Sequence, residues 1–182
     1  MIIVYDTETT GLTLHPDAPL NKQPRMIEFG AALLDERGEV VETESIIIDP
    51  LEPLTPEITR ITGLRDEDCA GQPPFIEALP RIRRIFSRAH TVIAHNLPFD
   101  KAILWGELAR TDFRDFPWPA EELCTVGLYR EAWGRNPKLT ELYEAVKGEP
   151  LAQTHRALDD VMALVEVIRE EELWRLARGA KG

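Results

Sequence analysis

The sequence predicts an α/β domain built on a mixed sheet. Three strand-like segments begin the chain, and helical segments with further short strand-like runs follow them. Acidic residues follow two of these strands, and in open α/β sheets such strand ends converge on one crevice. The 182 residues, 43% of them hydrophobic, are enough to bury one core. We therefore expect a single domain at residues 1–178 and a short tail at 179–182.

The first three strands are predicted to form an antiparallel meander. Residues 2–4 are a β-branched run, and residues 26–34 and 40–48 are typical of a hairpin. Residues 12–25 contain three prolines and no hydrophobic period, which predicts a long loop between the first two strands. Loops of this length often border functional sites. Two roles stay open for this loop: it shapes the access of a substrate, or it contacts a partner.

Helical spacing and short apolar runs predict the remaining elements. Thr55 before Pro56 is typical of a helix start, as is Pro98 shortly after Asn96. Short strands are expected at 91–94 and 122–125. Helices are expected at 56–62, 75–89, 97–108, 126–133 and 139–146, and residues 154–160 run into a last helix that fades before Gly179.

Charge and hydropathy restrict the classes of function. The 21 basic and 32 acidic residues give a formal charge of −11, which argues against broad electrostatic capture of a polyanion. A nucleic-acid substrate would therefore be held locally and with the help of metal. No apolar run approaches the roughly 18 residues that span a bilayer, and no signal-peptide pattern begins the chain. We expect a cytoplasmic protein without membrane contact.

Acidic residues recur where strands and helices meet. Side chains alternate across a strand, so Asp6 and Glu8 share a face and can bind one hard cation. Taken alone, the pair is equally typical of solvated acids before a turn. Asp100 follows a second strand, and Asp160 lies early in the last helix. Clustered acids repel one another, so a cluster predicts divalent cations, and oxygen ligands favour Mg²⁺ or Mn²⁺.

His155 is a candidate general base. It stands five residues before Asp160, and an imidazole titrates near neutral pH. Two divalent cations can activate a water on one side of a phosphodiester and stabilise the leaving oxygen on the other. A surface histidine at a helix start is the plain alternative for His155. With the four acids, however, it predicts hydrolysis of a phosphodiester.

Four motifs, in order, resemble those of a known family. DTETTG at residues 6–11, ITGL at 61–64, HNLPFD at 95–100 and HRALDD at 155–160 are similar to the successive motifs of the DnaQ-like DEDDh 3′ to 5′ exonucleases. The resemblance covers residues 1 to about 168 and implies a ribonuclease H-like fold, with a central mixed five-stranded sheet flanked by helices. It also implies the site: metal binding and catalysis by Asp6, Glu8, Asp100 and Asp160, with His155 as the general base.

Substrate contacts are expected from residues beside these motifs. Backbone amides after the metal pair, and the leucine there, are placed to hold the 3′-terminal nucleotide, as in members of the family. Residues at the end of the fourth strand are candidates for contacts to sugar or phosphate. For each of them, a role in packing within the protein is equally open. The candidate substrate-binding residues are Thr9, Gly11, Leu12, His95, Asn96 and Phe99. Asp159 points about 100° away from its neighbour around the helix and is interpreted as structural.

The resemblance implies a 3′ to 5′ exonuclease that acts on single-stranded nucleic acid with two divalent cations, Mg²⁺ or Mn²⁺. It would release nucleoside 5′-monophosphates, and DNA is favoured over RNA. An exoribonuclease or oligoribonuclease-like enzyme is the alternative, and a non-catalytic polymerase accessory module is a third interpretation. The sequence leaves open whether a polymerase or another protein is a partner. The sequence leaves the pathway, the oligomeric state and the processivity undecided.

Overall fold

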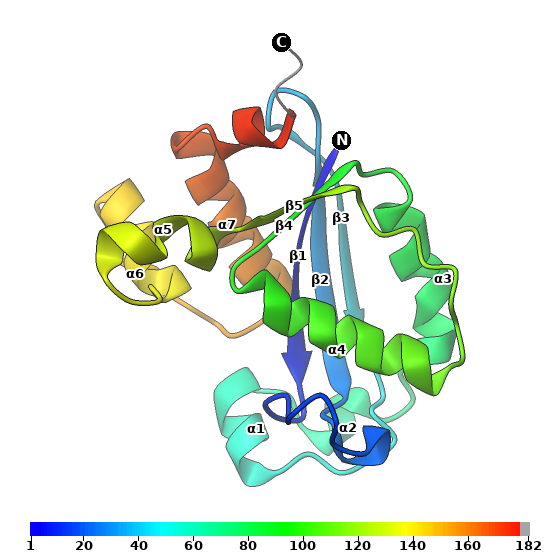
Figure 1. Cartoon of the computed structure of the whole chain (residues 1–182). Coiled ribbons are helices and arrows are strands. Elements are labelled where there is room, and N and C mark those ends of the chain that lie inside the picture. Colours follow the sequence, from blue (N-terminus) through cyan, green and yellow to red (C-terminus); the bar gives the residue numbers. More distant parts are fainter. Residues whose placement is uncertain (179–182) are drawn as a thin grey trace.

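A five-stranded mixed sheet forms the centre of the protein, as the sequence predicts (Figure 1). The computed structural model describes residues 1–178, and the tail predicted at 179–182 lies outside this range. The strands are β1 (Ile2–Thr9), β2 (Met26–Leu34), β3 (Val40–Ile47), β4 (Thr91–Ala94) and β5 (Glu121–Cys124). Their order is β3-β2-β1-β4-β5. The first three pair antiparallel, whereas β4 is parallel to both β1 and β5.

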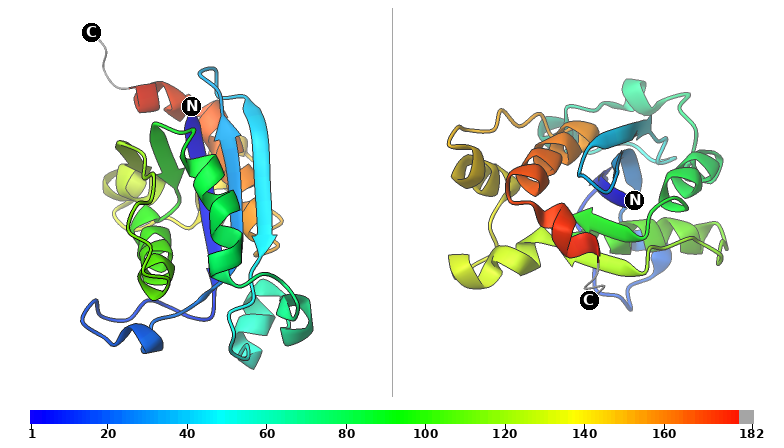
Figure 2. Two further views of the ribbon diagram at one scale, coloured as in Figure 1. Left: turned by 90° about the vertical axis from the view of Figure 1, so that its right-hand side faces the viewer. Right: turned by 90° about the horizontal axis from the view of Figure 1, so that it is seen from above.

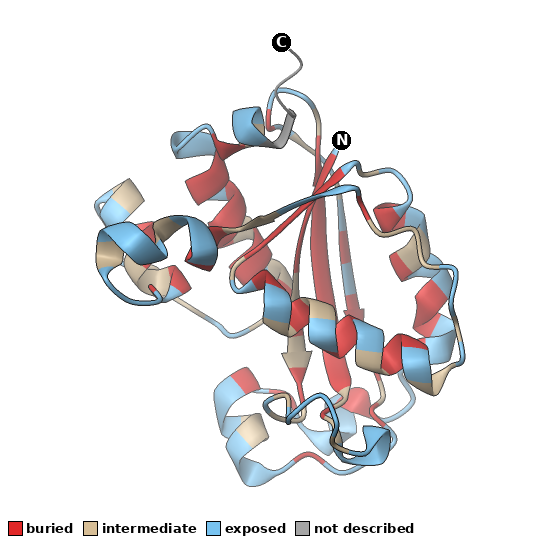
Figure 3. Ribbon diagram, in the orientation of Figure 1, coloured by how far each residue is buried: buried red, intermediate tan, exposed pale blue. Residues whose placement is uncertain are grey.

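Helices cover both faces of the sheet (Figure 2). The principal helices are α1 (Pro56–Thr62), α2 (Asp66–Cys69), α3 (Phe75–Phe86), α4 (Leu97–Arg110), α5 (Thr125–Trp133), α6 (Leu139–Lys147) and α7 (Ala157–Glu170). Side chains of β1 alternate between two apolar clusters: Ile3 and Tyr5 pack with residues of α3 and α4, and Ile2 and Val4 pack with residues of α6 and α7. The central strands are therefore covered from both sides, and Figure 3 shows them buried.

The structure extends some predicted elements and shortens others. β1 continues through Thr9, because β2 pairs with it along its whole length, so Asp6 and Glu8 lie inside the strand. α3 ends at Phe86, three residues before the predicted end. α7 ends at Glu170, and the residues that were expected to continue the last helix form a separate 3-10 helix, η2 (Leu173–Arg178). α2 and the 3-10 helix η1 (Leu20–Lys22) were not predicted, because segments of three or four residues are too short to show a helical period.

α1 shows how local chemistry sets the bounds of an element. The hydroxyl of Thr55 accepts a hydrogen bond from the Ile58 amide, and Pro56 occupies the first helical position. The helix ends at Gly63, whose φ of 73° is the left-handed conformation that favours glycine. Within residues 1–178, none of the helices has the length and the apolar composition needed to cross a membrane.

Candidate active site

Three carboxylates converge on one point beside β1. Oxygen atoms of Asp6, Glu8 and Asp160 all lie within 4.8 Å of one another. Asp6 and Glu8 project from β1 toward the face that α7 covers, and Asp160 lies in the first turn of α7. A donor set made only of carboxylate oxygens suits Mg²⁺ or Mn²⁺, so these residues fit the predicted metal site.

Asp100, the fourth predicted ligand, lies in the first turn of α4 and is not a member of this three-carboxylate cluster. Its Oδ1 accepts hydrogen bonds from the backbone amide of Thr7 (3.0 Å) and from the Thr7 hydroxyl (2.8 Å). Thr7 points to the opposite face of β1 from Asp6, so Asp100 approaches the cluster from the α4 side. Its charge still contributes to raising the pKa of Asp6.

The clustered carboxyl groups are more stable when they are protonated or bound to a cation than when they are charged and have no cation beside them. Burial raises the pKa of Asp6 well above its usual value, and repulsion by Asp100, Glu8 and Asp160 raises it further. The pKa of Glu8 rises to about 8, first through burial and then through repulsion by Asp160. Burial raises the pKa of Asp100 to about 7 despite the Thr7 hydrogen bonds. A bound divalent cation would hold all of these groups in their charged form.

His155 lies in the segment before α7, with a φ of 51° and an exposed side chain. It lines a cavity of about 640 Å³ together with Asp6 and Asp160. Burial raises the pKa of Asp160, while a hydrogen bond from Gln153 (3.0 Å) and the nearby His155 oppose that rise. The imidazole therefore faces the space beside the acidic cluster. Asp159, by contrast, is exposed and accepts a hydrogen bond from the Thr154 hydroxyl.

Two residues of β2 set the position of α7. Glu28 is buried, and its carboxylate accepts hydrogen bonds from Nε (3.0 and 3.2 Å) and Nη2 (2.8 Å) of Arg156 and from the Ala157 amide (3.2 Å). Two residues further along the strand, Gly30 allows the close approach of α7, because a Cβ there would lie 2.4 Å from the Ala157 carbonyl carbon. Both were missed in the sequence, although a glutamate and a glycine inside an apolar strand are the signals that could have revealed them.

The predicted substrate contacts occupy different environments. The Thr9 hydroxyl donates to the Gly11 carbonyl (2.7 Å), and Leu12 directly after it is 80% exposed. Both ring nitrogens of His95 are engaged within the protein: Nε2 donates to the Pro137 carbonyl (3.1 Å), so Nδ1 accepts from the Thr125 hydroxyl (2.9 Å).

Burial lowers the pKa of His95, which keeps the ring neutral. Asn96 is exposed, makes no capping bond with its side chain, and lines the same cavity as His155. Phe99 is half-buried and packs against the apolar cluster of α3 and α4, which is the packing role that the sequence left open. Substrate contacts by these residues stay predictions.

The fold and the acidic cluster define a ribonuclease H-like α/β protein. Solved structures support this class: the nuclease domain of 3′hExo, "a DEDDh family member", has a TM-score of 0.76 at 16% identity and covers 97% of this chain and 92% of that one. Exonuclease X has a TM-score of 0.66 at 21% identity, with 94% and 93% covered. The exonuclease family RNase_T matches residues 3–168. The chain therefore belongs to the DnaQ-like 3′ to 5′ exonuclease family.

Two relatives show how the chain compares with longer proteins. The DNA polymerase III subunit epsilon of Treponema pallidum is 32% identical over 166 residues, which cover 90% of this chain and 72% of that subunit. The PolC-type DNA polymerase III of Halalkalibacterium halodurans is 30% identical over 98% of this chain, but the chain spans only 11% of its length. The chain thus corresponds to a small part of such polymerases.

Proposed function

We propose that the chain is a divalent-cation-dependent exonuclease that removes nucleoside 5′-monophosphates from the 3′ end of single-stranded nucleic acid, with DNA favoured. The observation that carries this proposal is the cluster of Asp6, Glu8 and Asp160, whose oxygens lie within 4.8 Å of one another. A protein without metal chemistry would have no reason to bury repelling acids together. This argues against a non-catalytic accessory module.

Each residue has a distinct role in the proposed reaction. Asp6, Glu8 and Asp160 would hold the metal ions, and Asp100 would add a fourth negative charge from the α4 side. Bound divalent cations supply Lewis-acid stabilisation of the negative charge that develops on the phosphate. His155, at the open side of the cavity, takes the proton of the attacking water. Two cations, Mg²⁺ or Mn²⁺, are proposed because four carboxylates carry more negative charge than one divalent cation neutralises.

The known proteins favour nucleic acid and leave the sugar open. A structure of Exonuclease I in complex with single-stranded DNA shares the fold (TM-score 0.74, 18% identity). A structure described as 3′-exonuclease recognition of a histone mRNA stem-loop shares it equally well (TM-score 0.73, 16% identity). DNA is preferred in the proposal because the epsilon subunit and the PolC-type relatives are DNA polymerase III proteins. A polymerase is accordingly the proposed protein partner, and the cytoplasm the proposed location.

A labelled single strand tests the activity directly. The strand carries a label at its 5′ end and is incubated with Mg²⁺, Mn²⁺ or a chelator, beside the Asp6→Ala protein. We expect stepwise shortening from the 3′ end with either cation, release of nucleoside 5′-monophosphates, and none of this with the chelator or the variant. Equal shortening by wild type and variant would show that the activity does not come from this site.

Matched DNA and RNA strands of one sequence test the preference between sugars. We expect a higher kcat/KM for DNA. A higher value for RNA would replace the proposal by its alternative, an exoribonuclease that recognises the 2′-hydroxyl.

A further inference from the structure

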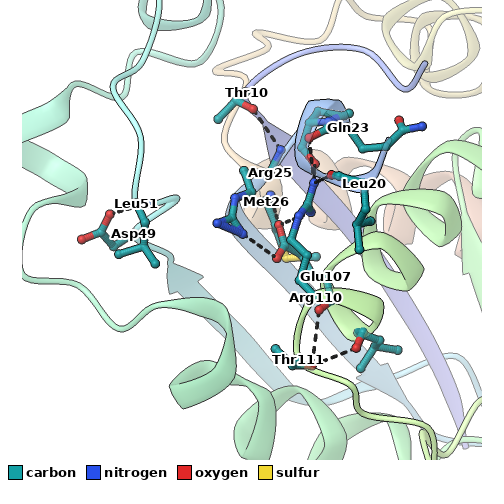
Figure 4. A network of polar contacts seen from close by, with 12 residues as sticks. Thr10, Leu20, Gln23, Arg25, Met26, Asp49, Leu51, Glu107, Arg110 and Thr111 are labelled. Carbon is teal, nitrogen blue, oxygen red and sulfur yellow. Dashed lines mark hydrogen bonds and ion pairs between the residues drawn. The ribbon is translucent and has the colours of Figure 1, made fainter. Parts of the chain in front are cut away.

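Arg110 of α4 holds the loop between β1 and β2 (residues 12–25) against the helix (Figure 4). Its guanidinium donates to the backbone carbonyls of Leu20 (2.9 Å), Gln23 (2.7 Å) and Pro24 (3.2 Å). All three carbonyls lie within hydrogen-bond distance of one nitrogen, Nη2, whose two N–H groups are shared among them, while Nη1 donates to Glu107. The second half of the loop is therefore attached to α4.

Glu107, one turn earlier on α4, keeps Arg110 in place. Its side chain is 3% exposed and lies 2.9 Å from the Arg110 guanidinium. It also accepts a hydrogen bond from the Met26 amide (3.1 Å) and lies 3.6 Å from the Arg25 guanidinium. A buried carboxylate is costly without such partners. Removal of Arg110 alone would leave Glu107 with the more distant Arg25, and removal of Glu107 alone would leave both guanidinium groups without this counter-charge.

The remainder of the loop is closed by its own contacts. Thr10 and Arg25 pair at its base, where the Thr10 amide donates to the Arg25 carbonyl (2.9 Å) and the Arg25 amide donates to the Thr10 hydroxyl (2.9 Å). The Gln23 side chain accepts from the Leu14 amide (3.0 Å) and donates to the His15 carbonyl (3.0 Å). These contacts offset the backbone entropy that is lost when the loop is ordered.

The loop and α4 enclose an apolar groove of about 520 Å³. Its lining includes Leu14 and Leu20 from the loop and Ala102 and Trp105 from α4. The two leucines and the tryptophan are 49%, 38% and 40% exposed, and none of the described residues that line the groove is charged. Ile103 also lines the groove and lies one turn after Asp100 on the same side of α4. Thr13, another lining residue, directly follows the candidate substrate contact Leu12, so the groove begins beside the candidate active site and continues along α4.

Building on the exonuclease function, we propose that this groove binds the bases that precede the 3′-terminal dinucleotide of a single strand, and that Arg110 is a positioning residue that keeps its loop wall in place. Aromatic and apolar side chains bind bases of any sequence by stacking and contact. Such binding suits a chain with a formal charge of −11, which has few cations for phosphates. A wall ordered before binding also avoids the entropic cost of ordering it then.

Abasic substrates and a groove variant test the proposal. KM and kcat are measured with Mn²⁺ for a dinucleotide, which ends before the groove, for an octanucleotide, and for an octanucleotide that lacks the third and fourth bases from its 3′ end. For the wild type, loss of these bases should raise KM about tenfold. In the double variant Leu14→Ser, Leu20→Ser, the intact octanucleotide should already show the raised KM, with little further effect of the abasic sites. Turnover of the dinucleotide should stay within about twofold of wild type.

Arg110 is tested in the double variant Arg110→Met, Glu107→Gln, which removes both charges and leaves neither buried alone. We expect KM for the octanucleotide to rise about tenfold, kcat/KM for the dinucleotide to stay unchanged, and trypsin to cleave faster after Lys22 in the freed loop. Arg114→Met is the matched control, because Arg114 is exposed and its ion pair within residues 1–178 is with the exposed Asp112. It should behave as wild type.

Any of three results would contradict the proposed binding of bases in the groove. The first is that abasic sites leave the wild-type KM unchanged, and the second is that KM is unaltered in both double variants. The third is an equal loss of kcat/KM on the dinucleotide and on the octanucleotide. Fluorescence anisotropy of a labelled octanucleotide measures the groove separately from catalysis. Equal Kd values for the wild type and the Leu14→Ser, Leu20→Ser protein would also overturn it. Failure of the wild type to hydrolyse any strand, with Kd still dependent on the leucines, would instead overturn the exonuclease function and leave the groove standing.

Discussion

At the scale of single residues, the acidic cluster keeps its carboxylates in a state that favours cation binding. Glu8 and Asp100 have pKa values of about 8 and about 7, because burial disfavours their charged forms. A metal-free site would therefore hold protons near neutral pH, and a divalent cation would displace them. Stability, metal affinity and pH are consequently coupled at this site.

We expect the metal-free protein to lose thermal stability as the pH rises from about 4.5 to about 8. Glu8 titrates at 4.5 in an unperturbed chain and at about 8 in the folded protein, so the folded state binds more protons across this window. Stability falls with pH wherever the folded state binds more protons, and the contribution is fully present only below the lower value. Thermal unfolding in chelator across this range measures the slope.

The matched variant Glu8→Gln should flatten this slope, and Mg²⁺ should raise Tm most at the upper end of the range. A wild-type Tm that stays level or rises between these pH values in chelator would contradict the assignment of protons to the cluster.

Two adjacent aspartates provide a matched test of the metal site. Asp160→Asn removes one of three clustered carboxylates and should reduce kcat by at least about 100-fold. Asp159→Asn changes an exposed side chain that bonds to Thr154, and should change kcat by less than about threefold. Mn²⁺ titration followed by electron paramagnetic resonance should show weaker binding for the first variant alone. Similar kinetics for the two variants would remove Asp160 from the site.

At the scale of elements, the contact between α7 and β2 determines where Asp160 and His155 lie. Glu28 bonds to Arg156 and to the first amide of α7, while Gly30 lets the helix backbone approach the strand. The start of α7 is thereby fixed to the strand that neighbours β1. The geometry of the acidic cluster therefore depends on this contact as well as on the three carboxylates.

Gly30→Ala should displace α7 and disturb the cluster. The new Cβ would lie 2.4 Å from the Ala157 carbonyl carbon and 2.5 Å from the Leu158 amide, both of them backbone atoms that cannot move aside. We expect a loss of about 1–3 kcal/mol in the free energy of unfolding and a fall in Mn²⁺ affinity of about 10- to 100-fold. Urea unfolding and metal titration measure the two effects.

Gly127→Ala is the control, since the nearest atom to a Cβ there is 3.7 Å away and α5 gains a better helix former. It should be neutral or stabilise the protein by about 0.5–1 kcal/mol. Unchanged metal affinity in Gly30→Ala would show that α7 reaches its position without this close contact.

At the scale of the whole molecule, the charge of −11 limits how a polyanion is held. We expect a shallow dependence of KM on salt, with a slope of log KM against log salt concentration of about 1 to 2, as few phosphates are neutralised outside the metal site. Hydrolysis should be distributive, with each strand released after few cleavages. Kinetics over a range of salt concentrations and an excess of unlabelled trap strand measure both properties; a slope above about 4 or processive shortening would contradict this expectation.

Sequence patterns predicted the strands and most helices, since hydrophobic period, proline placement and capping residues act over a few neighbours. The short helix α2 and the 3-10 helix η1 were not predicted, because they have too few residues to show a helical period. The same local rule predicted that Asp6 and Glu8 share a face of β1. Their positions after a strand and around the start of the last helix made Asp100, His155 and Asp160 candidates, and the order of the motifs supported the same residues. Their catalytic roles stay predictions.

By itself, the sequence determined which chemical groups are present and which neighbours share a face, because both follow from residue identity and from the period of strand or helix. Only the tertiary structure decided that Asp160 joins Asp6 and Glu8 while Asp100 bonds to Thr7 across β1. It alone also paired Glu28 with Arg156, and the loop of residues 12–25 with Arg110. Partners that lie many tens of residues apart depend on the order of strands and on side-chain packing, and no local period records either.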